Sequence, residues 1–198
     1  MSIKEDLLRT FGATEQHYNA GDYIFREAEF SQHYYQIVTG EVKLNNYDNE
    51  GKELIQNIIK SKDSFGTFML FINKSYPINA VANTDCMILQ LSKNNFLHLL
   101  EQQPTLLMDI CTGISERLYH KFVLMRTISC HNASERLKEV MDMMKQEQEN
   151  ENPFSFEIPF TRQQLASLTG LSLETTIRTV KKMEREKILR IKNRKILI

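Results

Sequence analysis

The sequence has no tryptophan and only three cysteines among its 198 residues. Cys86, Cys111 and Cys130 are far apart and show no Cys-x-x-Cys spacing, so we expect reduced thiols rather than a disulfide framework or a zinc knuckle. No apolar run approaches the roughly 20 residues needed to span a bilayer. The acidic start does not resemble an export signal, so we expect a cytoplasmic protein without a membrane partner.

Motifs of known catalytic chemistry are absent as well. The sequence contains no P-loop, no nucleophile elbow, no HExxH segment and no paired carboxylates of the kind that active sites use. It also identifies no metal site and no cofactor. We therefore do not expect an enzyme.

Acidic and basic residues balance across the chain, 25 against 25, but they are unevenly distributed. Residues 160–198 hold ten Lys or Arg and three Glu, a net charge of +7, which leaves −7 on the other 159 residues. A short basic segment on an acidic body favours a polyanionic partner for that segment.

The first half of the chain has the pattern of short strands. Runs of aromatic and β-branched residues alternate with turn signals at Gly21, Gly40 and Gly51, and Gly51 is free to adopt positive φ. Many short strands with glycine turns indicate a small barrel or sandwich. The expected strands cover residues 18–25, 33–38, 41–47, 54–59, 63–68 and 77–91.

The periodicity becomes helical at about Lys93. A short helix should stop before Pro104, and from there to residue 128 only Gly113 interrupts a long helix. One set of positions in that helix recurs at alternating spacings of four and three, the heptad rhythm of a coiled coil. This seam comprises Leu107, Cys111, Ile114, Leu118, Lys121, Met125 and Ile128. We favour a seam between two copies of the chain, and the alternative is an amphipathic helix that packs on its own barrel.

The C-terminal segment contains two short helices joined by a tight turn. Residues 132–134 mark a hinge, and a helix over 135–146, a polar loop and a strand over 154–158 are expected before the two helices. Thr161 and Gln164 then have the spacing of a capping box. Gly170 permits a left-handed turn, and Ser172 caps a second helix that ends near residue 186.

Charge gathers on one side of the second helix. Glu174, Arg178, Lys181 and Arg185 recur at spacings of four, three and four, and residues 188–198 form a hairpin with a basic tip. A helix-turn-helix followed by such a wing is typical of a DNA-binding domain. The alternative is that Glu174 and Arg178 are only an ion pair on the surface of a helix.

In a DNA-binding domain of this type the second helix enters the major groove with its N-terminus first. Arg178 can then read guanine, and Glu174 can accept from a cytosine amino group. The helix starts and the wing are placed to hold phosphates. The candidate DNA-binding residues are Thr161, Arg162, Gln163, Leu173, Glu174, Thr175, Ile177, Arg178, Lys181, Lys192, Arg194 and Lys195.

Three segments resemble the Crp/Fnr family of regulators. Residues 161–178, with Thr-Arg-Gln-Gln at one end and Gly-Leu-Ser-Leu-Glu-Thr-Thr-Ile-Arg at the other, resemble its helix-turn-helix signature, and residues 35–44 and 48–53 resemble a hairpin of its barrel. The resemblance implies an α+β fold: an N-terminal cyclic-nucleotide-binding-like β-barrel (jelly roll) over 1–103, a long central dimerisation helix over 104–131 and a C-terminal winged helix-turn-helix over 132–198. It also implies a homodimeric transcription regulator that reads palindromic double-stranded DNA, with RNA polymerase as a further partner.

The barrel departs from the cyclic-AMP-binding members that it resembles. Those members have a Gly-Glu pair for the ribose and an Arg-Ser pair for the cyclic phosphate, where this chain has Gly66-Thr67 and Tyr76-Pro77. The effector pocket that the resemblance implies comprises Gly66, Thr67, Tyr76, Pro77, Lys121 and Phe122. Because the charge that balances a phosphate is missing, we expect that cyclic AMP is not the effector; the alternative is a regulator that responds to a cyclic nucleotide or another small ligand through a non-standard pocket. Leu173 stands where the cyclic-AMP branch carries Arg, so we expect a different operator.

Overall fold

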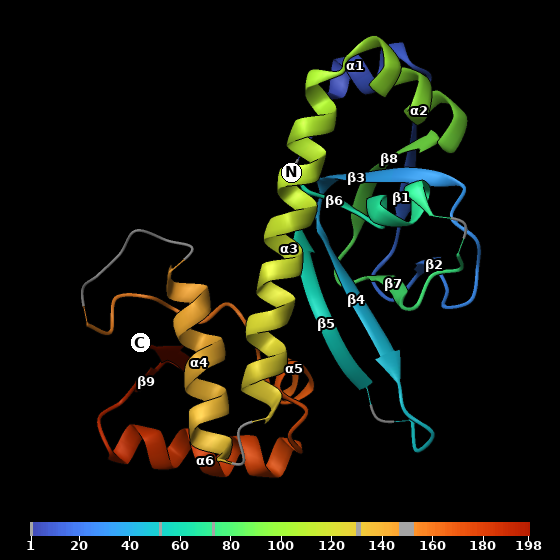
Figure 1. Ribbon diagram of the computed structural model, residues 1–198. Helices are drawn as coiled ribbons and strands as arrows, with labels where there is room; N and C mark the ends of the chain where they lie inside the picture. The colour runs from blue at the N-terminus through green and yellow to red at the C-terminus, as the bar shows by residue number, and fades with distance from the viewer. Residues whose placement is uncertain (1, 52, 73, 130–131, 147–152) are drawn as a thin grey trace. The chain divides into compact units, whose positions relative to one another are not determined.

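The computed structural model describes residues 2–51, 53–72, 74–129, 132–146 and 153–198 of the chain. These residues form two compact units, Met1–Leu118 and Tyr119–Ile198, which are described separately. Figure 1 shows strands gathered in the first unit and helices predominating in the second. Within the described residues, no helix combines the length and the apolar composition that crossing a membrane requires.

The first unit contains two four-stranded antiparallel sheets. The strand order is β1-β8-β3-β6 in one sheet and β2-β7-β4-β5 in the other. The strands are β1 (Thr14–Tyr18), β2 (Tyr23–Phe25), β3 (His33–Thr39), β4 (Glu41–Tyr47), β5 (Glu53–Lys60), β6 (Ser64–Phe65), β7 (Asn79–Ala82) and β8 (Cys86–Ser92). The expected β-rich N-terminal fold is confirmed, in the form of two antiparallel sheets packed face to face.

Three of the strands predicted from the sequence are wrong in extent. The strand expected over 18–25 is divided by a turn at Gly21, so that Tyr18 ends β1 and Tyr23 begins β2. The strand expected over 63–68 stops after Phe65, because Gly66 takes a left-handed conformation (φ +69°) and starts the 3-10 helix η1 (Thr67–Phe71). The β segment expected over 77–91 is divided into two strands, β7 and β8. Gly51 adopts the positive φ predicted for the turn between β4 and β5 (φ +78°).

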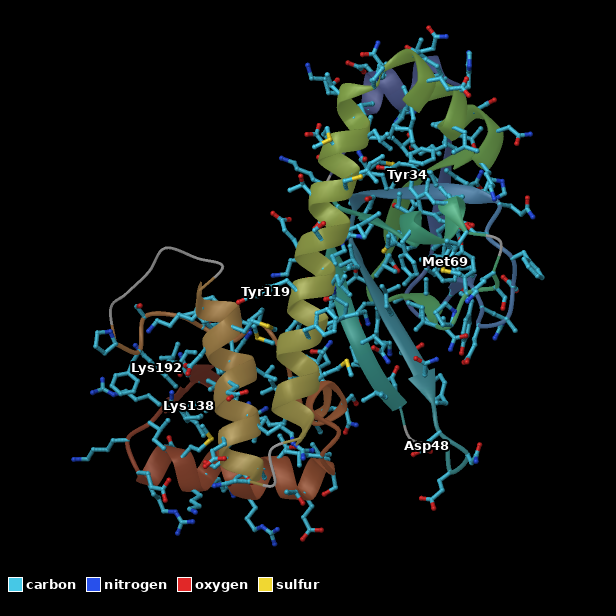
Figure 2. All side chains as sticks on the ribbon, viewed as in Figure 1. Tyr34, Asp48, Met69, Tyr119, Lys138 and Lys192 are labelled. Carbon is cyan, nitrogen blue, oxygen red and sulfur yellow. The ribbon has the colours of Figure 1, made fainter. Side chains whose placement is uncertain are left out.

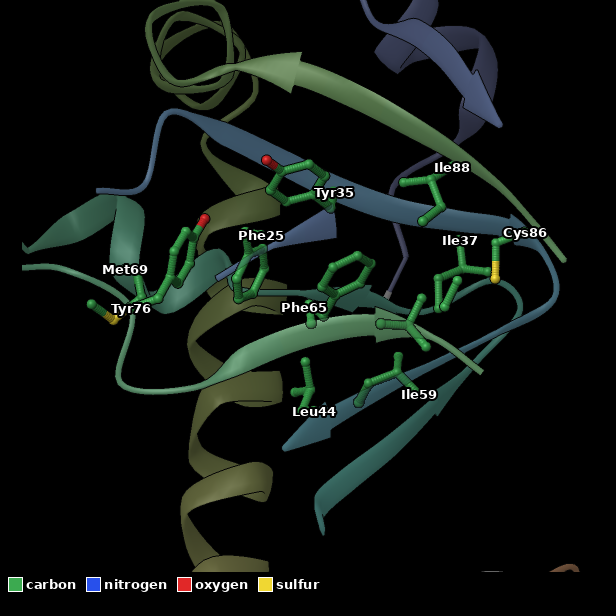
Figure 3. Close-up of a cluster of buried hydrophobic side chains, with 13 residues drawn as sticks. Phe25, Tyr35, Ile37, Leu44, Ile59, Phe65, Met69, Tyr76, Cys86 and Ile88 are labelled. Carbon is green, nitrogen blue, oxygen red and sulfur yellow. The ribbon is translucent and has the colours of Figure 1, made fainter. Parts of the chain in front are cut away.

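Apolar side chains from both sheets pack between them. Alternation along β4 turns Val42 and Leu44 into this core, as the period of a strand requires. Four aromatic rings form the centre of the cluster drawn in Figure 3, namely Phe25, Tyr35, Phe65 and Tyr76. Phe25 lies within 6.0 Å of each of the other three ring centroids.

A second core joins the first sheet to the helices of this unit. These are α1 (Glu5–Thr10), α2 (Lys93–Gln102) and the beginning of α3 (Thr105–Ser129). Tyr34 of β3 stacks on Phe96 of α2 with 4.7 Å between ring centroids. Ile110 of α3 is buried in the same cluster. The helices therefore cover apolar side chains on the face of the sheet that points away from the aromatic core.

Helix α3 carries the positions of the predicted dimer seam. Ile114 is half-buried and packs against the core that α1 and α2 share, and Arg117 donates from Nη2 to the Ser64 carbonyl at 2.7 Å. Leu107, Cys111, Leu118, Lys121 and Met125 are exposed, whereas the side chain of Ile128 lies outside the described part. One side of the helix thus packs on its own barrel, so Ile114 follows the alternative interpretation of the sequence. The contact between two copies of the chain along the other seam positions stays a prediction.

The second unit is built on α4 (Ala133–Gln146), α5 (Arg162–Thr169), α6 (Leu173–Arg185) and the hairpin of β9 (Arg190–Lys192) and β10 (Lys195–Leu197). Its core includes Leu137, Leu165, Val180 and Leu189. The strand predicted over 154–158 is wrong in extent, because Phe154 has φ +60° and only Glu157 forms a bridge, to Leu197.

Candidate nucleic-acid interface

The two helices of the turn motif start at the predicted caps. The Gln164 backbone N–H donates to Thr161 Oγ1 at 3.1 Å, and the Thr161 N–H donates to Gln164 Oε1 at 2.9 Å, so the capping box is complete. Ser172 caps α6 by accepting from the Thr175 N–H at 3.1 Å. Both caps fix where a helix begins, and the remaining N–H groups of such a start can meet a phosphate.

The turn between these helices is held by backbone geometry and by one arginine. Gly170 adopts φ +66°, the left-handed conformation that ends α5, and the Leu171 N–H returns to the Ala166 carbonyl. Arg136 of α4 donates from Nη1 to the Thr169 carbonyl at 3.0 Å. This hydrogen bond joins α4 to the end of α5, just before the turn that leads into α6.

Helix α6 has one buried side and one exposed side. Thr176, Thr179, Val180 and Met183 are buried against the core. The residues that line an open trough along the other side are Leu173, Glu174, Ile177, Arg178, Lys181 and Arg185. Figure 2 shows long side chains that extend from α6 away from the rest of its unit. The predicted charged stripe is therefore accessible along the helix.

Glu174 and Arg178 are not an ion pair. Within the described part of the chain neither side chain forms a salt bridge, although both are exposed and four residues apart. The Ser172 hydroxyl donates to Thr175 Oγ1 at 2.8 Å, which orients Thr175 within the cap. The charged groups of Glu174 and Arg178 are thus available to a partner outside this unit.

The wing is a tight hairpin that is joined to the start of α5. Asn193 and Arg194 take left-handed conformations at its tip (φ +50° and +64°). Arg162 donates from Nη1 to the Arg194 carbonyl, a contact between residues 32 positions apart that the sequence did not indicate. Lys192, which Figure 2 labels, and Arg194 are exposed. Arg162 accordingly positions the wing with one of its N–H groups.

Lys195 has a partner of its own within the unit. Its Nζ lies 3.0 Å from Glu157 Oε1, and both side chains are more than half exposed. An ion pair of this kind is weak because water screens it. Lys195 can still meet a phosphate, but Glu157 competes for its charge. Gln163 is exposed in the first turn of α5, as a phosphate contact requires.

In the first unit the structure brings Gly66 close to Tyr76, two residues of the effector pocket that the resemblance implied. A Cβ on Gly66 would lie 3.3 Å from Tyr76 Cε1 and 3.2 Å from Phe25 Cε1. Tyr76 is only 2% exposed, stacks on Phe25 at 3.7 Å and donates to Ser31 Oγ at 2.8 Å. Thr67 is buried, and Pro77 is exposed. Lys121 and Phe122 are exposed residues of the second unit.

The two buried tyrosines of the core beside Gly66 are uncharged. Burial raises the pKa of Tyr76, and burial also raises the pKa of Tyr35 above its usual range. Both hydroxyls therefore stay neutral. Sequence reasoning named Tyr76 but not the rings that it contacts, since the alternation of apolar residues does not tell which aromatic side chains meet.

A β-sandwich and a winged helix-turn-helix in one chain are the architecture of a DNA-binding regulator with a sensor-type domain. Residues 15–103 match the cyclic nucleotide-binding domain, and residues 135–198 match the Crp-like helix-turn-helix domain. The cAMP-activated global transcriptional regulator CRP of Haemophilus influenzae is 25% identical over 183 residues, which cover 91% of this chain and 82% of that protein. The chain belongs to the Crp/Fnr family of transcription regulators.

Solved structures of known regulators have the same fold. The c-di-GMP responsive global regulator CLP of Xanthomonas campestris matches with a TM-score of 0.77 at 20% identity, over 96% of each chain. A CooA mutant from Carboxydothermus hydrogenoformans matches with a TM-score of 0.84 at 16% identity, over 100% of this chain and 87% of that one. The relative from Haemophilus influenzae is named as a global transcriptional regulator, and the protein of Xanthomonas campestris as a global regulator.

Proposed function

We propose that this chain is a sequence-specific regulator that binds a palindromic operator as a homodimer. The exposed outer side of α6 carries the proposal, because it presents Glu174 and Arg178 without internal ion pairing beside the basic wing. In this proposal residues 1–103 form a sensor-type barrel, 104–131 dimerise and 132–198 bind DNA. The proposed DNA contacts are those predicted from the sequence, with Lys195 as the weakest because of Glu157.

The exposed side chains of α3 support the homodimer. Large exposed apolar patches mark interaction sites, and a second copy would cover them in a closed two-fold assembly. The exposed large apolar residues of this helix are Leu107, Met108, Leu118, Tyr119, Phe122 and Met125. Two recognition helices related by a two-fold axis would read half-sites about one helical turn apart. Contact with RNA polymerase stays a prediction.

The effector in this proposal is not cyclic AMP, although the relative from Haemophilus influenzae is named as cAMP-activated. The Tyr76 ring lies against Gly66 and Phe25, and Tyr76-Pro77 stand where the cyclic-AMP-binding members carry the Arg-Ser pair for the phosphate. A buried phosphate without a balancing charge is strongly disfavoured. The second candidate is a ligand of other chemistry that binds the barrel at a non-standard site.

Selection from a library of random DNA duplexes tests the proposed function. The full-length chain should enrich an inverted repeat whose two half-sites are about one helical turn apart. A variant with Glu174→Ala and Arg178→Ala should keep its fold and lose the enrichment, because both side chains are exposed. Enrichment of no sequence over the starting library would contradict the proposal.

A further inference from the structure

Two large apolar side chains are exposed among the charged residues of α6. Leu173 is 41% exposed and Ile177 is 38% exposed, and both line the same open trough as Glu174 and Arg178. From residue 132 onward, Ile188 at 37% is the other large apolar side chain that is exposed in the described part. Leu173 and Ile177 are therefore unusual for this unit, and they coincide with the surface proposed to meet DNA.

Leu173 and Ile177 also lie at a defined place in the helix, its N-terminal turns. Leu173 is the first residue of α6, directly after the capping Ser172, and Ile177 follows one turn later. Residues four apart lie on the same side of a helix. The two side chains thus form a short apolar edge along the N-terminal turns, which are the turns that enter the major groove.

The major groove offers one apolar group to such an edge, the C5 methyl of thymine. A cytosine at that position would place its amino donor against a side chain that cannot accept a hydrogen bond, and the donor would lose its water. A phosphate is also an unsuitable partner for Leu173 and Ile177, because these side chains have neither a hydrogen-bond donor nor a positive charge. Neither residue can therefore serve as a backbone contact in the way that Lys192 can.

We infer that Leu173 and Ile177 are specificity-determining residues that contact thymine methyl groups of the operator. Each half-site then contains thymines next to the base pairs that Glu174 and Arg178 read. At the position that Leu173 meets, the preferred base is then thymine. This inference rests on the proposed function and adds the chemistry of the operator to it.

The experiment uses the full-length chain and the duplex that selection enriches. Each thymine of one half-site is replaced in turn by deoxyuridine, which removes the methyl group and leaves base pairing intact, and affinity is measured by fluorescence anisotropy at one salt concentration. Removal of one buried methyl group should weaken binding roughly fourfold. Leu173→Ala should abolish the sensitivity at one thymine, and Ile177→Ala should abolish it at another.

Ile188→Ala is the matched control, since Ile188 is equally exposed but lies outside the trough. This variant should keep the full sensitivity to both deoxyuridine replacements. The inference is overturned if no replacement weakens the wild type, or if Leu173→Ala and Ile177→Ala retain the same sensitivity. Selection of an operator without thymine in the half-sites also overturns it, while the proposed function stands. Failure to select any operator overturns both.

Discussion

Arg178 lies one turn inside α6, on the exposed side and without an ion-pair partner among the described residues. Arg178→Ala should cost roughly 1–3 kcal/mol on the selected operator, because the bidentate hydrogen bonds to guanine are removed. Competition binding with operators altered at single positions should show relaxed preference at one base pair. Lys138→Ala is the control, since Lys138 pairs with Asp142 on α4. If Arg178→Ala lowers the affinity for the operator and for random duplex equally, Arg178 binds a phosphate and does not read a base.

Buried tyrosines give the first unit a dependence on alkaline pH. Burial raises the pKa of Tyr35 in the folded chain, whereas an unfolded tyrosine titrates near 10. The unfolded state therefore releases its proton first, and the free energy of unfolding falls above pH 10, by up to about 1.4 kcal/mol per pH unit for each such tyrosine. Denaturant titrations from pH 8 to 11 should show a shallower fall for Tyr35→Phe than for the wild type. An equally steep fall for Tyr35→Phe and for the wild type would contradict this explanation.

At the scale of elements, α3 would serve two surfaces at once in the proposed dimer. Leu118 is 51% exposed, while Ile114 contributes to the core of its own unit. Leu118→Asp should yield monomers, because a charge would be placed against its two-fold copy in a dry contact. Light scattering with analytical ultracentrifugation measures this outcome. Glu116→Gln, a charge change at another exposed position of the helix, should leave the dimer intact. An unchanged dimer for Leu118→Asp would disprove the seam.

The wing is the element that we expect to hold phosphates rather than read bases. Replacing Lys192 and Arg194 by Ala should weaken operator and random duplex about equally. The slope of log affinity against log salt should become shallower by about one unit for each phosphate that the wing no longer neutralises. A variant whose slope equals that of the wild type would show that the wing does not touch the backbone of DNA.

Several elements could be predicted because their signals are local. The capping box at Thr161 and the left-handed turn at Gly170 depend on neighbouring residues and appear as expected. Contacts between distant residues were not predictable in this way. The Arg162 contact to the Arg194 carbonyl and the stacking of Tyr76 on Phe25 join segments 32 and 51 positions apart. The period of a strand likewise gives its two faces but not the point at which Gly66 ends it.

At the scale of the whole molecule, the barrel and the DNA-binding segment differ in what they can bind. Tyr76-Pro77 replace the Arg-Ser pair that balances the phosphate in cyclic-AMP-binding members, so cyclic AMP should not bind at micromolar concentration. Isothermal titration of the full-length chain measures this directly. Titration of a heparin fragment or random duplex under the same buffer should still give heat, because residues 160–198 carry a net charge of +7. Micromolar affinity for cyclic AMP would contradict the effector part of the proposal.

The central claim is that one exposed helix side and a basic wing make this chain a sequence-specific regulator. The most direct measurement is the affinity of the full-length protein for its selected operator and for a random duplex of equal length, over a series of salt concentrations. We predict that both affinities fall linearly on logarithmic axes. At physiological salt the operator should be preferred by at least about 10³-fold. Equal affinities for the two duplexes at every salt concentration would contradict the account, because the chain would then bind DNA only as a polyanion.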